Sequence, residues 1–394
     1  MKRLLFMGVP AFGHTNPTLL LVQKLIEEGH HVRYYTVSNF RESLEQLGAE
    51  VICYDDQIDY LTIEHVNEPT HNQKNHFAAL LGIVSEAIED VLNHYLEDIR
   101  AYAPDVIIGD SLALWASIIA DQLGVPYISY NTHFVFNEHT PTMLTDPSLK
   151  GNFKTLLQLP EVLKHYKTIK KFGYPTKHVT DLALTRTDIP IIVTTSRQFQ
   201  PAGNTFDNNV HFVGPVVRES DAVWKKTNRP LVYISLGTVN NQAKAFYQNC
   251  FTALKEKDID VLLSVGAKTD ISSLGDIPEN FQVAHAVDQI AVLKSADVFL
   301  THCGLNSTSE ALYYEVPLLV FPQTVEQEMV ANRVLAMNSG MRLEANTPEA
   351  ISAGIETVLN TPAYKAHAKQ VSLDFKASGG VEAAMQVVLR TTKP

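Results

Sequence analysis

The stretch VFLTHCGLNSTSEALYYEVPLLVF, residues 298–321, predicts a strand, a tight turn, a helix and a second strand in succession. Residues 298–301 and 318–321 are short apolar runs, typical of strands that are buried on both faces of a parallel sheet. Gly304 allows a tight turn after the first strand, and the polar residues that follow it favour a helix start. A strand–helix–strand unit of this kind indicates an α/β fold.

The same alternation of strand and helix recurs on both sides of this stretch. Residues 4–9 form another buried-strand pattern. Asn16 followed by Pro17 predicts the N-cap and first residue of a helix, and Gly29 predicts its end. Further strands are expected at 32–37, 106–109, 126–130, 191–195, 231–236, 261–265 and 282–284, with helices between them, including one at 113–123. The repetition predicts two doubly wound, mainly parallel sheets.

The polar segment GPVVRESDAVWKKTNRP, residues 214–230, is bracketed by glycine and proline and predicts a linker between domains. We expect domains at 1–214 and 230–375, separated by a linker at 215–229. The last segment, 376–394, contains a predicted helix at 381–390 that is expected to cross back onto the first domain. Two such domains bind ligands at the carboxyl ends of their strands, in the crevice between them.

The composition favours a soluble globular protein, since 45% of the 394 residues are hydrophobic and 19% are charged. A formal net charge of -11 argues against broad binding of nucleic acid or of an anionic membrane. The three cysteines lie far apart and form no CxxC pair, which indicates a reduced compartment. The apolar run after Met1 is too short for a signal peptide, and no stretch is long enough to span a bilayer. We therefore expect a cytoplasmic protein without membrane insertion, with a monomer as the default state.

The turn at 301–310 has the features of a phosphate site. Free backbone N–H groups and the positive end of the helix dipole at Gly304 suit a phosphate group. His302 and the hydroxyls of Ser307 and Thr308 could add side-chain hydrogen-bond donors. Glu310 lies one helical turn further on and can accept hydrogen bonds from a pair of ribose hydroxyls. Taken alone, these residues are better explained as caps of the helix.

A candidate general base, His14, follows the first predicted strand in the sequence GHTNP. Imidazole titrates near pH 6.5, so a neutral ring is available at pH 7 to take a proton from a hydroxyl group. Asp110, at the end of the strand at 106–109, could orient the ring and stabilise its charged form. Without other context, His14 could also cap or pack against a helix, and Asp110 could cap the helix that follows it.

Residues 287–327, VDQIAVLKSADVFLTHCGLNSTSEALYYEVPLLVFPQTVEQ, resemble the donor-binding signature of the family 1 UDP-glycosyltransferases in both composition and spacing. The phrases ISLGT at 234–238, RQFQP at 197–201 and FVGP at 212–215 also resemble family sequences, especially those of bacterial macrolide and flavonoid glucosyltransferases. The resemblance implies the GT-B fold, with two Rossmann-like domains facing across a cleft. It further implies metal-independent, inverting transfer of a hexose, such as glucose from UDP-glucose, to a hydroxyl of a small, largely apolar acceptor. Phenols, flavonoids and macrolides are acceptors of this kind.

The same resemblance assigns roles to individual residues. His14 would be the base, supported by Asp110, in an acceptor-binding N-terminal domain. The residues implied for the nucleotide sugar are Gly237, Thr238, His302, Gly304, Asn306 and Ser307 at the pyrophosphate, Glu310 at the ribose, Gln289 and the Val287 backbone at the uridine, and Glu326 and Gln327 at the sugar hydroxyls. No cofactor and no metal are implied beyond the nucleotide sugar itself.

This sequence departs from the family pattern at three positions. Ala286 stands where plant members carry a tryptophan against the uracil, and Asp288 replaces the usual proline. Glu326 stands where most members have aspartate. The first two bear on the identity of the base, with dTDP as the alternative to UDP, and the third bears on sugar placement.

Several other patterns have ordinary explanations. Asp258 and Asp260 form a DxD sequence, known as a metal-binding signature in another glycosyltransferase fold, but a solvated turn before a strand is the expected structure here. The basic run between Lys164 and Lys177 is expected to be a solvated helix face, with contact to a membrane or an acidic acceptor as the alternative. The residues Phe134, Phe136 and Met143 could line an acceptor pocket or belong to the core.

Two other functions are compatible with the same motifs. A sugar-nucleotide epimerase or hydrolase would consume the donor without an acceptor. A regulatory protein that only binds nucleotide sugars would need the second-domain site but no base, and the presence of His14 and Asp110 argues against it.

Overall fold

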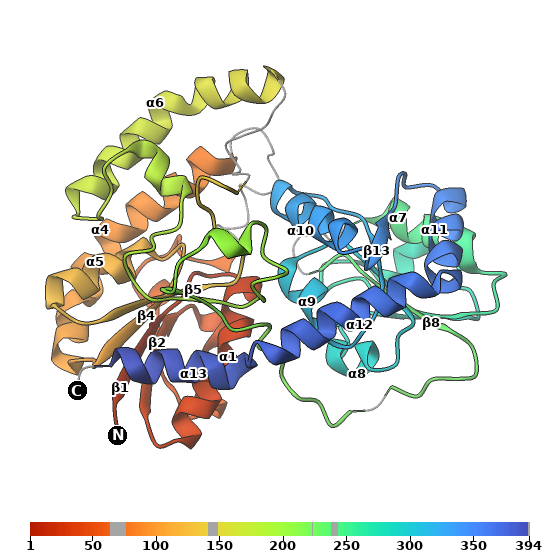
Figure 1. Ribbon diagram of the computed structural model, residues 1–394, viewed down its shortest axis with the longest axis horizontal. Coiled ribbons are helices and arrows are strands. Elements are labelled where there is room, and N and C mark those ends of the chain that lie inside the picture. Colours follow the sequence, from red (N-terminus) through yellow and green to blue (C-terminus); the bar gives the residue numbers. More distant parts are fainter. Residues whose placement is uncertain (64–75, 141–148, 223, 238–242, 393–394) are drawn as a thin grey trace. The chain divides into compact units, whose positions relative to one another are not determined.

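The computed structural model describes residues 1–63, 76–140, 149–222, 224–237 and 243–392. The chain divides into two compact units, each with its own parallel sheet (Figure 1). Unit 1 comprises Met1–Val216 and Ser378–Pro394, and unit 2 comprises Val217–Ala377.

The segment expected to be a linker belongs to unit 2 from Val217 onward, and its ion pairs explain why. Arg218 pairs with Asp288 at 2.5 Å, Lys226 pairs with Asp297 at 2.5 Å, and Arg229 pairs with a carboxylate of β9. The polar segment from Val217 to Pro230 is therefore attached to unit 2 by ion pairs.

Unit 1 is built on a seven-stranded parallel sheet with the order β3-β2-β1-β4-β5-β6-β7. Its strands are β1 (Arg3–Met7), β2 (His31–Thr36), β3 (Glu50–Cys53), β4 (Val106–Asp110), β5 (Tyr127–Asn131), β6 (Ile191–Val193) and β7 (Val210–Phe212). The central strand β4 is buried along its whole length, as its apolar sequence predicts. Strands β3 and β7, which lie at the two edges of the sheet, were not predicted from the sequence.

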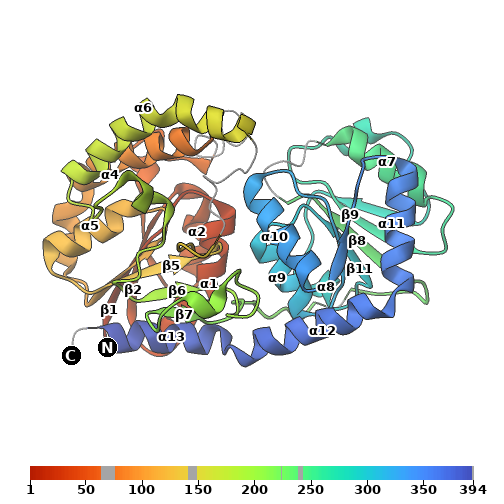
Figure 2. The same ribbon diagram turned by 45° about the horizontal axis from the view of Figure 1, so that its top comes forward.

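The helices of unit 1 lie on both faces of this sheet. They are α1 (Phe12–Glu27), α2 (Arg41–Gln46), α4 (His76–Tyr102), α5 (Leu114–Leu123), α6 (Leu149–Lys171) and α13 (Gly380–Thr391), with short 3₁₀ helices at Ser38–Phe40, Tyr54–Asp56, Val179–Ala183 and Gly203–Thr205. The C-terminal helix α13 lies beside α1 (Figure 2), and its residues Val381, Ala384 and Val388 are part of the unit 1 core. The prediction that the last helix returns to the N-terminal domain is therefore confirmed.

Unit 2 repeats this architecture with a six-stranded parallel sheet of order β10-β9-β8-β11-β12-β13. Its strands are β8 (Leu231–Ser235), β9 (Asp260–Ser264), β10 (Phe281–Ala284), β11 (Val298–Thr301), β12 (Leu318–Val320) and β13 (Gly340–Arg342). Its helices are α7 (Lys244–Leu254), α8 (Gln289–Leu293), α9 (Leu305–Tyr313), α10 (Val325–Ala336), α11 (Pro348–Asn360) and α12 (Pro362–Ala377), with a 3₁₀ helix at Ile271–Leu274. The prediction of two doubly wound α/β domains is confirmed. The edge strand β13 was not predicted.

The start of α1 differs from the prediction. The helix begins at Phe12 with Ala11 as its N-cap, and Pro17 lies inside it. Proline lacks only its own amide, which would otherwise bond to the Gly13 carbonyl four residues earlier, and the residues before it can still be helical. His14 is consequently in the first helical turn, where its own amide bonds to the Ala11 carbonyl at 3.1 Å, and not in a loop.

The order of strands reverses direction once in each sheet. In unit 1 the reversal lies between β1 and β4, and in unit 2 it lies between β8 and β11. The loops that follow the two strands at such a point diverge to opposite sides and leave space at the carboxyl end of the sheet, where α/β proteins bind ligands. Within the ranges that the structure describes, no helix is both long and apolar enough to cross a membrane.

Candidate active site

His14 and Asp110 form a hydrogen-bonded pair at the reversal point of unit 1. Strands β1 and β4 pair in parallel with Met7 opposite Gly109, so the first turn of α1 lies beside the end of β4. His14 Nδ1 is 2.7 Å from Asp110 Oδ2, although 96 residues separate the two in the sequence. The imidazole is 19% exposed and the carboxylate only 5%, so water competes little for this contact.

Asp110 also caps the turn that follows it. Its second oxygen, Oδ1, accepts a hydrogen bond of 2.8 Å from the Leu112 amide. Asp110 thus contacts the histidine and holds the turn, but it does not cap α5, whose N-cap is Ala113 without a side-chain hydrogen bond. Two fixed donors hold this carboxylate in one orientation relative to the imidazole.

Two residues beside this pair, Thr132 and His133, were not assigned a role from the sequence. Thr132 Oγ1 is 3.3 Å from His14 Nδ1. His133 Nδ1 donates to the Phe134 carbonyl at 2.7 Å, and its Nε2 lies 2.8 Å from the Ser111 hydroxyl. Both residues follow β5, which pairs in parallel with β4, so their closeness to Asp110 could have been expected from the order of strands.

The aromatic residues considered for an acceptor pocket separate into two groups. Phe134 is 3% exposed and packs against Phe199, so it belongs to the core. Phe136 is half-buried and stacks on His133 with ring centroids 6.2 Å apart, and the His133 ring lies 6.3 Å from that of His14. An aromatic surface therefore lies beside the His14–Asp110 pair. Met143 lies outside the described residues.

In unit 2 the corresponding reversal point is occupied by His302, in the turn between β11 and α9. Gly237, after β8, has φ of +79°, and a Cβ atom there would lie 2.5 Å from the His302 ring. A Cβ on Gly304 would lie 2.9 Å from the same ring. Cys303, which lies between His302 and Gly304 in the sequence, adopts φ of +68°. This conformation costs a non-glycine residue on the order of 1 kcal/mol and is concentrated at functional turns. Thr238 lies outside the described residues.

His302 is neutral at physiological pH. Burial lowers the pKa of its imidazole to about 4, while a hydrogen bond to the Ser235 backbone opposes the shift. Its Nδ1 is buried and has no hydrogen-bond partner among the described residues. Burial without a partner is costly for a polar atom of this kind.

Four of the predicted nucleotide-binding residues form one network at the start of α9. Gln289 Nε2 donates to Glu310 Oε2 at 2.5 Å and to Ser307 Oγ at 3.2 Å. Asn306 Nδ2 donates to Glu310 Oε1 at 3.1 Å. The Tyr233 hydroxyl donates to Gln289 Oε1 at 3.1 Å. Burial raises the pKa of Glu310, and the Gln289 hydrogen bond partly offsets this effect.

The residues expected to bind the sugar hydroxyls lie at the start of α10. Gln327 Oε1 accepts from the Gln323 amide at 2.7 Å, and Thr324 caps the helix by accepting from the Gln327 amide at 3.3 Å. Glu326 is exposed in the same first turn. Among the described residues, no hydrogen bond joins either side chain to the network around Glu310. Val287 lies on the segment between β10 and α8, two residues before Gln289.

Comparison with known proteins identifies the fold and family. The family described as erythromycin biosynthesis protein CIII-like, C-terminal domain, matches residues 248–385. The NDP-glycosyltransferase YjiC of Bacillus subtilis is 34% identical over 384 residues, covering 96% of this chain and 94% of YjiC. The uncharacterised UDP-glucosyltransferase YojK of the same organism is 32% identical, covering 100% of this chain and 98% of YojK. This chain is a family 1 glycosyltransferase.

A solved structure supports the same assignment at the level of the fold. The calicheamicin glycosyltransferase CalG4 is 24% identical to this chain and superposes on it with a TM-score of 0.82. The match covers 99% of this chain and 98% of CalG4. The glycosyltransferase therefore has the GT-B fold that its sequence resembles.

The DxD sequence of this glycosyltransferase has a structural role. Asp260 is the first residue of β9, where its carboxylate pairs with Arg229 and accepts a hydrogen bond from Thr227, and Asp258 is exposed. The described part of the chain contains no group of three or more histidine, cysteine, aspartate or glutamate side chains arranged to hold a metal ion.

The depressed pKa of His302 predicts a pH-dependent stability of unit 2. An unfolded histidine titrates near 6.5, so acid protonates the unfolded state before the folded state, and stability is lost as pH falls from about 6.5 toward 4. The contribution of His302 amounts to about 3 kcal/mol at pH 4. Urea unfolding between pH 7 and pH 4 should therefore show a smaller loss of stability for His302→Gln than for the wild type.

The matched control for this experiment is His367→Gln, since His367 is exposed on α12 of the same unit. That variant should keep the wild-type pH dependence. Equal slopes for His302→Gln and the wild type would show that His302 is not held neutral by burial.

Proposed function

We propose that this glycosyltransferase moves a hexose, glucose from UDP-glucose, with inversion to a hydroxyl group of a small, largely apolar acceptor. Phenols such as flavonoids, or macrolides, are the proposed acceptor class. The observation that carries the proposal is the 2.7 Å contact between His14 Nδ1 and Asp110 Oδ2 in the first turn of a helix. The names of the Bacillus relatives support a nucleoside-diphosphate sugar as donor.

In the proposed mechanism His14 acts as the general base. An ionised Asp110 can only accept a hydrogen bond, so it places the imidazole proton on Nδ1 and leaves Nε2 as the proton acceptor. Nε2 takes the proton of the acceptor hydroxyl as its oxygen bonds to the anomeric carbon. The bond from that carbon to the diphosphate breaks on the opposite side, which inverts the configuration. Asp110 then stabilises the imidazolium that forms.

The donor site is proposed at the turn before α9. The first backbone N–H groups of this nine-residue helix and its dipole would offset the charge of the diphosphate. His302 would keep a neutral ring beside the diphosphate, and the glycines at 237 and 304 let the backbone approach that ring closely. Glu310 would accept hydrogen bonds from the ribose hydroxyls, in exchange with the amides of Gln289 and Asn306 that now hold it.

Charge stabilisation by backbone amides, a helix dipole and side-chain donors removes the need for a divalent ion. We therefore propose that turnover requires no metal. Transfer to a phenol would be favoured over transfer to an alkyl alcohol, because a phenol, with a pKa near 10, gives up its proton more readily to a single histidine.

Replacement of His14 tests the role of the base. His14→Ala should lower kcat by about 10²–10⁴-fold, because a positioned general base contributes that much. The dissociation constant for UDP should stay within about twofold, since ground-state binding of the donor does not involve this group. Initial rates and calorimetric titration with UDP measure the two quantities. His94→Ala, an exposed histidine on α4, is the control and should have wild-type kinetics. Wild-type turnover by His14→Ala would rule out His14 as the base.

Release of UDP from UDP-glucose tests the reaction class and the metal requirement. In the presence of EDTA, release should depend on a flavonoid or simple phenol acceptor, and added magnesium should not change the rate. Release without an acceptor would point to a hydrolase or epimerase. Loss of turnover in EDTA, restored by magnesium or manganese, would contradict the metal-independent mechanism.

A further inference from the structure

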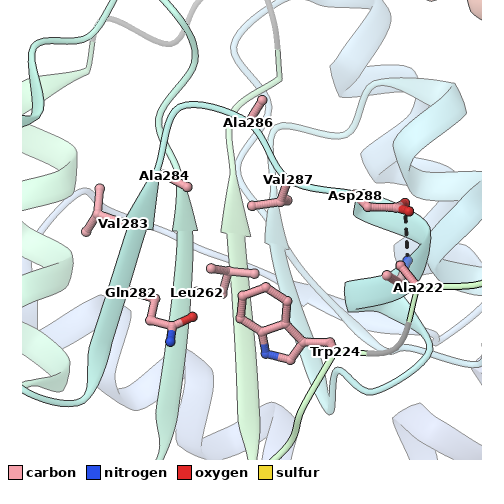
Figure 3. Close-up of a pocket in the computed structure, with 10 residues that line it drawn as sticks. Ala222, Trp224, Leu262, Gln282, Val283, Ala284, Ala286, Val287 and Asp288 are labelled. Carbon is pink, nitrogen blue, oxygen red and sulfur yellow. Dashed lines mark hydrogen bonds between the residues drawn. The ribbon is translucent and has the colours of Figure 1, made fainter.

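Asp288, the residue immediately before α8, holds the start of that helix. Its carboxylate accepts a hydrogen bond of 3.4 Å from the Ala291 amide and is the N-cap of the helix (Figure 3). The Asp288 carbonyl accepts from the Val292 amide at 3.1 Å. With five residues, α8 is shorter than the roughly 12 that an isolated helix needs to be stable in water. Its placement therefore depends on its packing and on the contacts at its ends.

The same carboxylate is bound from outside the helix by residues 218–220, here called the entry segment, which lie at the start of unit 2. The Arg218 guanidinium donates to Asp288 Oδ1 at 2.5 Å, and the Ser220 hydroxyl donates to Oδ2 at 2.5 Å. At the other end of α8, Lys294 Nζ donates to the Ser220 carbonyl at 2.6 Å. The entry segment is thus tied to both ends of α8.

Asp288 is ionised at neutral pH. Burial raises the pKa of its carboxyl group, but the hydrogen bonds from Ser220 and Arg218 outweigh this effect and hold the pKa below its usual value. An ionised carboxylate accepts several hydrogen bonds through its two oxygens, and those from a charged donor are the stronger ones. One charged group therefore joins the entry segment to the first turn of α8.

Asp288 stands where the family pattern has a proline. Its φ of −70° is one that proline also adopts, so either residue fits this backbone angle before α8. A proline, however, has no side-chain acceptor for the Arg218 guanidinium or the Ser220 hydroxyl. The substitution therefore adds a side-chain link between the entry segment and α8.

Gln289, the next residue, connects α8 to the network around Glu310. Its Nε2 donates to Glu310 Oε2 at 2.5 Å and to Ser307 Oγ at 3.2 Å. Residues 290–293 of α8 are buried, whereas Gln289 is only half-buried. Packing thus fixes the rest of the helix, and the direction of the Gln289 side chain depends on how the start of α8 is held.

We propose that Asp288 is a positioning residue of the donor site. By binding Arg218 and Ser220 it fixes the start of α8, and it thereby holds the Gln289 amide against Glu310. The proposal rests on the proposed function, because it takes Glu310 to bind the ribose of a nucleoside diphosphate sugar. A network that is already ordered binds its ligand at a lower entropic cost, although Asp288 itself need not touch the donor.

Calorimetric titration with UDP tests this role. Asp288→Ala removes the cap and both links, and it should weaken UDP binding by about 3- to 30-fold. Asp288→Asn keeps an acceptor for the Ala291 amide but loses the charge, and it should weaken binding by about 2- to 5-fold, as should Arg218→Ala. The double variant Asp288→Asn with Arg218→Ala should bind UDP no more weakly than the weaker of the two single variants, because both remove the same contact.

Steady-state kinetics separate a positioning role from a catalytic one. In Asp288→Asn the KM for UDP-glucose should rise by the same factor as the dissociation constant for UDP. The kcat and the KM for the acceptor should stay at their wild-type values, because only binding of the donor is affected. A fall in kcat with an unchanged KM for UDP-glucose would overturn the proposal.

The matched control is Lys226→Ala, which removes the ion pair with Asp297 and leaves the bonds to α8 intact. It should bind UDP as the wild type does, and an equal loss of affinity in this variant would overturn the proposal. A lower unfolding temperature of Asp288→Ala with wild-type affinity for UDP would also overturn it, because Asp288 would then only support the fold. Failure of the wild type to bind UDP or dTDP would instead remove the proposed donor, and this proposal with it.

Discussion

The contact between His14 and Asp110 depends on a constraint set by the sheet of unit 1. Two strands far apart in the sequence, β1 and β4, are neighbours in parallel register at the point where the strand order reverses. Only this pairing places the first turn of α1 beside the carboxyl end of β4. In unit 2 the same constraint acts on β8 and β11, with Ser235 opposite Thr301, and it places the turn at Gly237 against His302. Both candidate sites are thus products of one topological feature.

The two histidines are distinguished by what surrounds them. His14 has a buried carboxylate on one ring nitrogen, which suits a group that must gain a positive charge during a reaction. No carboxylate among the described residues pairs with His302, and burial keeps its pKa near 4, which suits a group that must stay neutral beside a diphosphate. Close approach of backbone to His302 is possible because the residues at 237 and 304 are glycines. The roles proposed for the two histidines, proton transfer and anion binding, thus differ because their environments differ.

Much of this arrangement could be predicted from the sequence, because its signals are local. Apolar runs located the central strands, and the residue types at the strand ends indicated His14, Asp110, His302 and Glu310 as a candidate set. The start of α1 was misplaced because Pro17 is a strong local signal, whereas the helix continues through it. The edge strands β3, β7 and β13 are short and only partly apolar, which leaves little pattern to detect. The attachment of the predicted linker to unit 2 depends on the ion pairs of Arg218 with Asp288 and of Lys226 with Asp297, which only the folded chain brings together.

The most direct test of the central claim is the tautomer of His14 at neutral pH. Nitrogen-15 NMR of the imidazole, assigned by the loss of its signals in His14→Gln, reports which ring nitrogen carries the proton. An ionised Asp110 hydrogen-bonded to Nδ1 predicts a protonated Nδ1 and an unprotonated Nε2. A proton on Nε2 with Nδ1 unprotonated would mean that Asp110 does not orient the ring, and it would contradict the assignment of Nε2 as the base.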